Sequence, residues 1–280
     1  MAVEELKKTL VLGHRNPDTD SICSAICYAG FKHQLTGENY EPCRAGNVNP
    51  ETQYVLDYFK LKAPRLVENV KTQVKDIEIR KTKGVSRGIS LKNAWGLMQE
   101  NNVVTLPCVT EEGLLEGVIT IGDITKSYMN LYDSSIISKA CTKYANILDT
   151  LEGSMVVGDS EAYFDRGKVL IAAANPDLME NYIEKHDLVI LGNRYESQLC
   201  AIEMEAGCII VCEGAGVSLT IRKLAQERGC AVITTPYDTY TTARLINQSM
   251  PISYFMTKEN IIEFSEEDYL DDIREIMASK

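Results

Sequence analysis

Apolar and polar positions alternate near the start of the chain in a pattern that predicts a strand, a polar loop and a helix. Residues 8–13 form a short apolar run, and the loop HRNPDTD follows it. Apolar residues then recur at i, i+3, i+4 and i+7, at Ile22, Ala25, Ile26 and Ala29. This spacing predicts an amphipathic helix capped by Asp20 or Ser21, so the loop lies at the carboxyl end of a strand, where open α/β sheets bind ligands.

The next segment has a different pattern of apolar and polar residues, and this pattern predicts a compact β-α-β-β-α unit. Its helix is expected over 91–100, its strands over 103–109 and 115–121, and a second helix begins near Asp123. Beyond residue 153, apolar runs such as LVILG and CIIVCEGAG alternate with amphipathic stretches at 176–185, 196–206, 218–228 and 239–247. Strands separated by helices predict a parallel sheet.

The last thirty residues resemble the beginning of the second segment. Both contain a short strand, a polar loop and an acidic helix, but the later copy has no counterpart of VVTLPCV or GVITIGD. We therefore expect the chain to be a fragment with a helix face and a strand edge left unpartnered. The expected division is 1–68, 69–128, 129–248 and 249–280.

Composition and charge exclude several classes of protein. With 45% hydrophobic and 25% charged residues, disorder and coiled coil are poor fits. The net charge of −11 repels nucleic acid, and no apolar run is long enough to span a membrane, so we expect a cytoplasmic protein. The nine cysteines contain no C-x-x-C, and several lie in apolar segments, which indicates reduced, buried thiols at Cys23, Cys27, Cys108, Cys208 and Cys212.

The loop HRNPDTD carries the most distinctive chemistry. His14, Asp18 and Asp20 offer an imidazole and two carboxylates, which suit divalent metals such as Mn²⁺, and Pro17 stiffens the loop. Capping and turn formation explain the same residues equally well.

GHRNPDTDSICSA resembles the first metal motif of the DHH phosphoesterase superfamily, in the form found in family II, manganese-dependent inorganic pyrophosphatases. The resemblance implies a partial DHH domain and a two-metal site for pyrophosphate, with Mn²⁺ or Co²⁺ in the protein and Mg²⁺ with the substrate. His14 and Asp18 would hold one ion, and Asp20 would help to hold the other. The family completes this cage with an Asp-His-His motif and further Asp residues. This chain has only His14, His33 and His186 and no Asp-His-His, so it is expected to be inactive alone.

LPCVTEEGLLEGVITIGDI resembles a CBS motif, in which Thr120 and Asp123 match positions that contact the phosphate and ribose of an adenine nucleotide. A hydroxyl can donate to phosphate and a carboxylate can accept from ribose, although Asp123 as a helix cap is the simpler alternative. CBS motifs work in pairs, so 249–280 would begin an incomplete second motif.

CAVITTPYDTYTTARLINQSMPI is similar to a DRTGG domain. A DRTGG domain between two CBS motifs resembles the regulatory insert of CBS-containing family II pyrophosphatases, and this implies regulation by AMP, ADP or ATP and a homodimer. The turn Gly214–Gly216 lacks the third glycine of a dinucleotide motif, and Lys185-His186-Asp187 is read as structural. Residues 238–244 could bind phosphate at a helix start, but Asp238 as a cap is simpler.

Two further hypotheses remain open. The chain could be a non-catalytic module that binds adenine nucleotides. Alternatively, it could be a fragment of a DHH exopolyphosphatase or nanoRNA hydrolase, although the string from Asn16 to Ile22 favours pyrophosphate.

Overall fold

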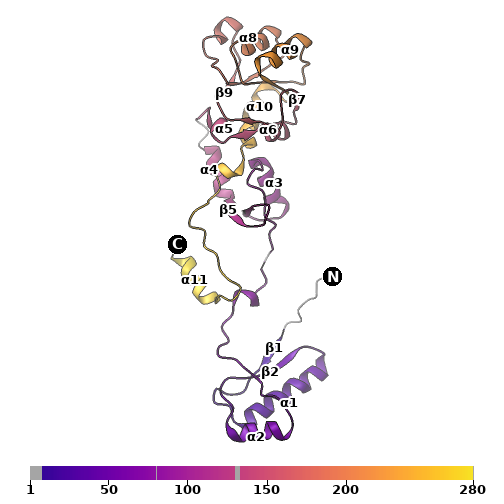
Figure 1. Ribbon diagram of the computed structural model, residues 1–280, viewed down its shortest axis with the longest axis vertical. Helices are drawn as coiled ribbons and strands as arrows, with labels where there is room; N and C mark the ends of the chain where they lie inside the picture. Colours follow the sequence, from indigo (N-terminus) through magenta and orange to yellow (C-terminus); the bar gives the residue numbers. More distant parts are fainter. Residues whose placement is uncertain (1–7, 80, 130–132, 280) are drawn as a thin grey trace. The chain divides into compact units, whose positions relative to one another are not determined.

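The computed structural model describes residues 8–79, 81–129 and 133–279, which form a mixed α/β structure. It divides into two compact units (Figure 1). The first unit joins Met1–Ile79 to Glu263–Lys280, and the second comprises Arg80–Ile262.

The first unit contains a small parallel sheet with the strand order β1-β2-β3. Its elements are β1 (Thr9–Val11), α1 (Thr19–Thr36), β2 (Tyr40–Arg44), α2 (Pro50–Tyr58), β3 (Arg65–Leu66), the 3-10 helix η1 (Val74–Asp76) and α11 (Leu270–Ala278). The predicted strand, loop and helix at the start of the chain are therefore confirmed.

The predicted cap of α1 was wrong by two or three positions. Asp18, not Asp20 or Ser21, precedes the helix in an extended conformation, and its carboxylate accepts a hydrogen bond from the Ser21 N–H. A cap side chain reaches the amide three residues ahead, and Ser21, three residues after Asp18, is the last residue before the intrahelical hydrogen bonds begin with the Ile22 N–H.

The second unit is built around a five-stranded sheet with the order β7-β12-β11-β10-β9. The elements that precede this sheet along the chain are α3 (Leu91–Glu100), β4 (Thr105–Val109), β5 (Leu115–Thr120), α4 (Ile121–Met129), α5 (Ile136–Lys139), β6 (Thr142–Lys143) and α6 (Tyr144–Thr150). Those that follow are β7 (Ser154–Val157), β8 (Tyr163–Phe164), β9 (Val169–Ile171), α7 (Pro176–Met179), β10 (Leu188–Leu191), α8 (Tyr195–Glu203), β11 (Cys208–Val211), α9 (Leu219–Arg228), β12 (Ala231–Thr234), α10 (Thr239–Leu245), η2 (Ile246–Ser249) and η3 (Ile252–Tyr254).

The predicted parallel sheet is confirmed for β9 to β12, and the structure adds the antiparallel strand β7 at one edge. Figure 1 shows α8 and α9 on one side of this sheet and α5, α6 and α10 on the other. Because both faces are covered, every residue of β10 and β11 is buried. Alternate residues of these strands enter two separate apolar clusters, one on each face.

The predicted β-α-β-β-α unit forms a hairpin of β4 and β5 with α3 and α4. In the last thirty residues, where a strand edge was expected to lack a partner, Thr257 exchanges two backbone hydrogen bonds of 2.9 Å with Val118 of β5. The segment after the DRTGG-like region therefore returns to the hairpin within the second unit.

Among the described residues, no helix combines the length and the apolar character needed to cross a bilayer.

Candidate functional site

The polar loop in the first unit brings two of its three predicted metal ligands together. His14 Nε2 lies 3.3 Å from Asp18 Oδ1, and both side chains are more than half exposed. The pKa of Asp18 is lowered chiefly by the hydrogen bond from the Ser21 backbone N–H, with a smaller contribution from His14. The Asp18 carboxylate is thus ionised and accessible to a cation, and it also caps α1.

Asp20 lies on the first turn of α1 and does not join this pair. Its carboxylate accepts a hydrogen bond of 3.4 Å from the Ser24 hydroxyl. Across the described ranges, no group of three or more His, Cys, Asp or Glu side chains is placed to hold a metal ion. In donor chemistry, the imidazole and carboxylate of His14 and Asp18 fit two ligands of a divalent cation.

Two glycines allow the loop to take this shape. A Cβ on Gly13 would lie 1.8 Å from the Ser21 hydroxyl, and a Cβ on Gly46 would lie 2.5 Å from the Arg15 carbonyl oxygen. The hydroxyls of Thr19 and Thr52 lie 3.0 Å apart and connect the first turns of α1 and α2. The loop is therefore fixed by close backbone packing on one side and by a helix start on the other.

Thr120 and Asp123 lie together at the start of α4 in the second unit. The backbone N–H and hydroxyl of Thr120 donate to Asp123 Oδ2 at 2.9 and 2.7 Å, and the Asp123 N–H donates to the Thr120 hydroxyl at 3.2 Å. This reciprocal arrangement is a capping box, so the helix-cap alternative accounts for the contacts between the two residues. Both side chains are half-buried.

Three other motifs singled out in the sequence take part in local structure. Asp238 caps α10 by accepting from the Thr241 N–H at 2.8 Å, and Gly214 sits in a turn with a φ of 62°. His186 adopts a φ of 71° in the turn before β10.

The cysteines agree only in part with the expectation of buried thiols. All nine are free, and Cys108, Cys208 and Cys212 are buried, but Cys23 is only half-buried and Cys27 is exposed. The prediction was wrong for the last two because successive turns of α1 direct them away from the face that contacts the sheet.

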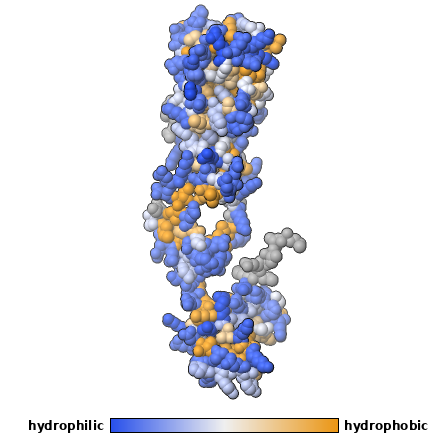
Figure 2. Space-filling view, in the orientation of Figure 1, coloured by the Kyte–Doolittle hydropathy of each residue, from blue (hydrophilic) through white to orange (hydrophobic). Residues whose placement is uncertain are grey.

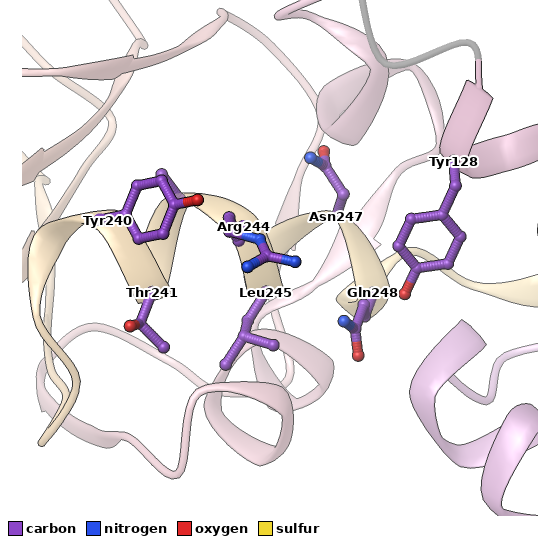
Figure 3. Close-up of a pocket in the computed structure, with 8 residues that line it drawn as sticks. Tyr128, Tyr240, Thr241, Arg244, Leu245, Asn247 and Gln248 are labelled. Atoms are coloured by element: carbon purple, nitrogen blue, oxygen red, sulfur yellow. The ribbon is translucent and has the colours of Figure 1, made fainter.

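Sequence reasoning missed a cavity of about 420 Å³ beside α10 (Figure 3). Its lining includes Tyr128, Tyr240, Arg244, Asn247 and Gln248, and neither Thr120 nor Asp123 is part of it. The spacing of Tyr240 and Arg244 by four residues on a helix was the signal that could have indicated it.

Two family models match the central part of the chain. The CBS domain model matches residues 74–130, and the DRTGG domain model matches residues 146–249.

Curated relatives match nearly the whole chain. It is 39% identical over 268 residues to the cobalt-dependent inorganic pyrophosphatase of Clostridium perfringens, covering 96% of this chain and 49% of that protein. It is 30% identical over 276 residues to a probable manganese-dependent inorganic pyrophosphatase of Thermotoga maritima, covering 98% of this chain and 50% of the relative. The chain spans about half the length of these two relatives.

A solved structure shares this fold. It contains the CBS and DRTGG domains of the regulatory region of Clostridium perfringens pyrophosphatase, complexed with the activator diadenosine tetraphosphate. The match has a TM-score of 0.70 and 35% sequence identity, and it covers 75% of this chain and 91% of the other.

Proposed function

We propose that the chain belongs to the family of inorganic pyrophosphatases with CBS and DRTGG domains, and that it couples binding of an adenine nucleotide to hydrolysis of pyrophosphate. The observation that carries this proposal is the likeness of the chain to a regulatory region whose activator is diadenosine tetraphosphate. In this proposal the second unit senses the nucleotide, and the first unit supplies part of the catalytic site.

We propose the domain division expected from the sequence. Residues 1–68 would be part of a DHH catalytic domain, 69–128 a first CBS motif, 129–248 a DRTGG domain and 249–280 the beginning of a second CBS motif. The family models for CBS and DRTGG domains support the two central assignments.

In the first unit, His14, Asp18 and Asp20 would hold Mn²⁺ or Co²⁺, the metals in the names of the relatives. A bound divalent ion supplies Lewis-acid stabilisation of the attacked phosphoryl group. The role of this chain is to hold the imidazole of His14 beside the ionised carboxylate of Asp18, on a loop that Gly13 and Gly46 keep close to the helix start. Mg²⁺ would enter with pyrophosphate.

In the second unit, the capping box of Thr120 and Asp123 would form part of the nucleotide site. Asp123 Oδ2 takes both hydrogen bonds from Thr120, so Oδ1 is the oxygen that would accept from a ribose hydroxyl. The start of α4 would add the positive end of a helix dipole, which favours phosphate.

Titration calorimetry with AMP and ATP tests the nucleotide site. Asp123→Ala is expected to weaken binding at least about tenfold, as one charge-assisted hydrogen bond contributes on that order. Ser218→Ala is the matched control, because it removes another helix cap of the same unit, at the start of α9. Equal affinities in the wild-type chain and Asp123→Ala would remove this site from the proposal.

A second candidate is a nucleotide-binding module without catalysis by this chain. The arrangement that favours it is the pairing of His14 with Asp18 alone, since the structure described here brings no third metal-binding side chain to them. We expect the chain alone to release no phosphate from pyrophosphate when Mn²⁺ is added. Turnover at the level of a full-length relative would exclude this candidate.

Assembly and location complete the proposal. We expect a homodimer in the cytoplasm that does not bind nucleic acid, in keeping with the net charge of −11. Sedimentation velocity would report the mass of the assembly, and a monomer at all concentrations would refute the dimer.

A further inference from the structure

The cavity beside α10 contains an arginine without an acidic partner. No Asp or Glu is among the described residues that line the cavity, and none lies within ion-pair distance of Arg244. Its guanidinium instead lies 5.7 Å from the centre of the Tyr240 ring. In a chain of net charge −11, an uncompensated cation in a concave site is set up to attract an anion.

Aromatic rings flank this arginine. In Figure 3 the Arg244 side chain lies along α10 between Tyr240 and Tyr128. The Tyr128 ring comes from α4, and its pKa is raised by burial, with an opposing contribution from the nearby Arg244 charge. Tyr240 is 69% exposed, so the face of its ring is available for stacking. Aromatic rings bind any nucleobase by stacking.

Amide side chains complete the lining. Asn247 and Gln248 are half-buried and line the cavity from η2, directly after α10. Within the part of the chain that the structure describes, neither amide side chain makes a hydrogen bond to the protein. An amide offers a donor beside an acceptor, which matches the edge of adenine.

We propose that this cavity is a second nucleotide site, which binds a purine nucleotide with its phosphate on Arg244 and its base against Tyr128 or Tyr240. The volume of about 420 Å³ lies within the range of small-molecule sites. The site is separate from Thr120 and Asp123, so it does not depend on the nucleotide site proposed above. A site for a simple anion would need only the arginine. The tyrosine rings and the amide side chains are groups that would bind the nucleobase.

Calorimetry and saturation-transfer NMR with the whole chain test this site. AMP is expected to bind at two sites per chain. Arg244→Gln should weaken one of them at least tenfold, while Asp123→Ala should weaken only the other. Arg228→Gln is the matched control, because Arg228 is a half-exposed arginine of the same unit that does not line the cavity.

A ligand without a phosphate group tests the residues proposed to bind the base separately from Arg244. Adenosine, which has no phosphate, should bind this site equally in the wild-type chain and Arg244→Gln, and at least tenfold more weakly in Tyr240→Ala. Both substituted side chains are exposed, so the variants should keep the thermal unfolding midpoint of the wild-type chain.

Three results would overturn the proposal. The first is unchanged AMP binding in both Arg244→Gln and Tyr240→Ala. The second is a single AMP site that is lost in Asp123→Ala. The third is a change in sedimentation coefficient in Arg244→Gln with AMP affinity unchanged, which would identify the cavity as a contact between two copies of the chain.

Discussion

The two units differ most in how completely they cover their apolar surface. Both large apolar clusters consist of residues of the second unit, which packs helices on both faces of its sheet. In the first unit, α1 covers only a three-stranded sheet, and Tyr28, Phe31 and Leu35 remain more than half exposed. Figure 2 shows hydrophobic side chains at the surface around α1 and α2.

This difference indicates what each unit can do by itself. Strands buried on both faces gain their stability within one unit, so the second unit is expected to fold without help. The first unit brings His14 and Asp18 together on one loop, but it leaves exposed apolar surface of the kind that other polypeptide covers.

The largest loss of stability is expected from a substitution that creates a cavity in the core. Ile210→Ala removes a fully buried side chain from the centre of β11 and should lower the free energy of unfolding by about 4 kcal/mol. The single tryptophan, Trp95 of α3, reports this transition by fluorescence in urea. Ile22→Ala makes a similar cavity in the first unit and should leave the Trp95 transition in place. An equal shift in both variants would show that the units unfold together.

Thiol reactivity gives a second, chemical test of the comparison. Five of the six cysteines of the second unit are buried, but only Cys43 is buried among the three of the first. Burial raises the pKa of Cys108 to about 11 and that of Cys230 to about 12. At pH 8 these two thiols should react with a disulfide reagent at least roughly 100-fold more slowly than Cys27, because the thiolate is the reactive form. Rapid native labelling of Cys108 or Cys230, located by mass spectrometry, would contradict the burial of the second unit.

A methyl group at Gly46 should disturb the first unit alone. Gly46→Ala places Cβ 2.5 Å from the Arg15 carbonyl oxygen and 2.7 Å from Pro17, so we expect a loss of about 1–3 kcal/mol. Hydrogen exchange of the amides in 14–21 should accelerate, with no change in the second unit.

Gly30→Ala is the matched control for this substitution. Gly30 lies in α1 with no atom near its added Cβ, so alanine should stabilise the helix by about 0.5–1 kcal/mol. If Gly46→Ala left exchange in the loop unchanged, close backbone packing would not be what shapes the loop that carries His14 and Asp18.

The smallest change in stability is expected from the removal of an exposed ion pair of the second unit. Lys139 and the Ser135 hydroxyl and N–H hold the pKa of Asp133 at about 2, below its ordinary value of 3.8. A lowered carboxyl pKa stabilises the fold above pH 3.8, and this contribution is lost as the pH falls toward 2. Asp133→Asn should therefore flatten the decline of the thermal midpoint between pH 4 and 2. An unchanged slope would show that the pair contributes nothing measurable, as is common for exposed pairs.

Local sequence patterns determined many of the individual elements. The range 91–100 predicted for α3 agrees with the structure because a cap at Ser90 and helical spacing are both local signals. By contrast, the helix predicted over 176–185 ends at Met179 as α7, and the chain then turns toward β10. Amphipathic spacing does not record where the chain must turn to re-enter a sheet.

The sequence by itself determined the strand-loop-helix that carries His14 and Asp18, the parallel sheet and the helix start that carries Thr120 and Asp123. Each depends on spacing and capping within about twenty residues. Only the tertiary structure decided that β7 joins the sheet antiparallel, that Thr257 pairs with Val118, and that Tyr128 meets Arg244. These pairs are distant in sequence, and their contacts follow from burying apolar surface over the whole unit, which no local pattern encodes.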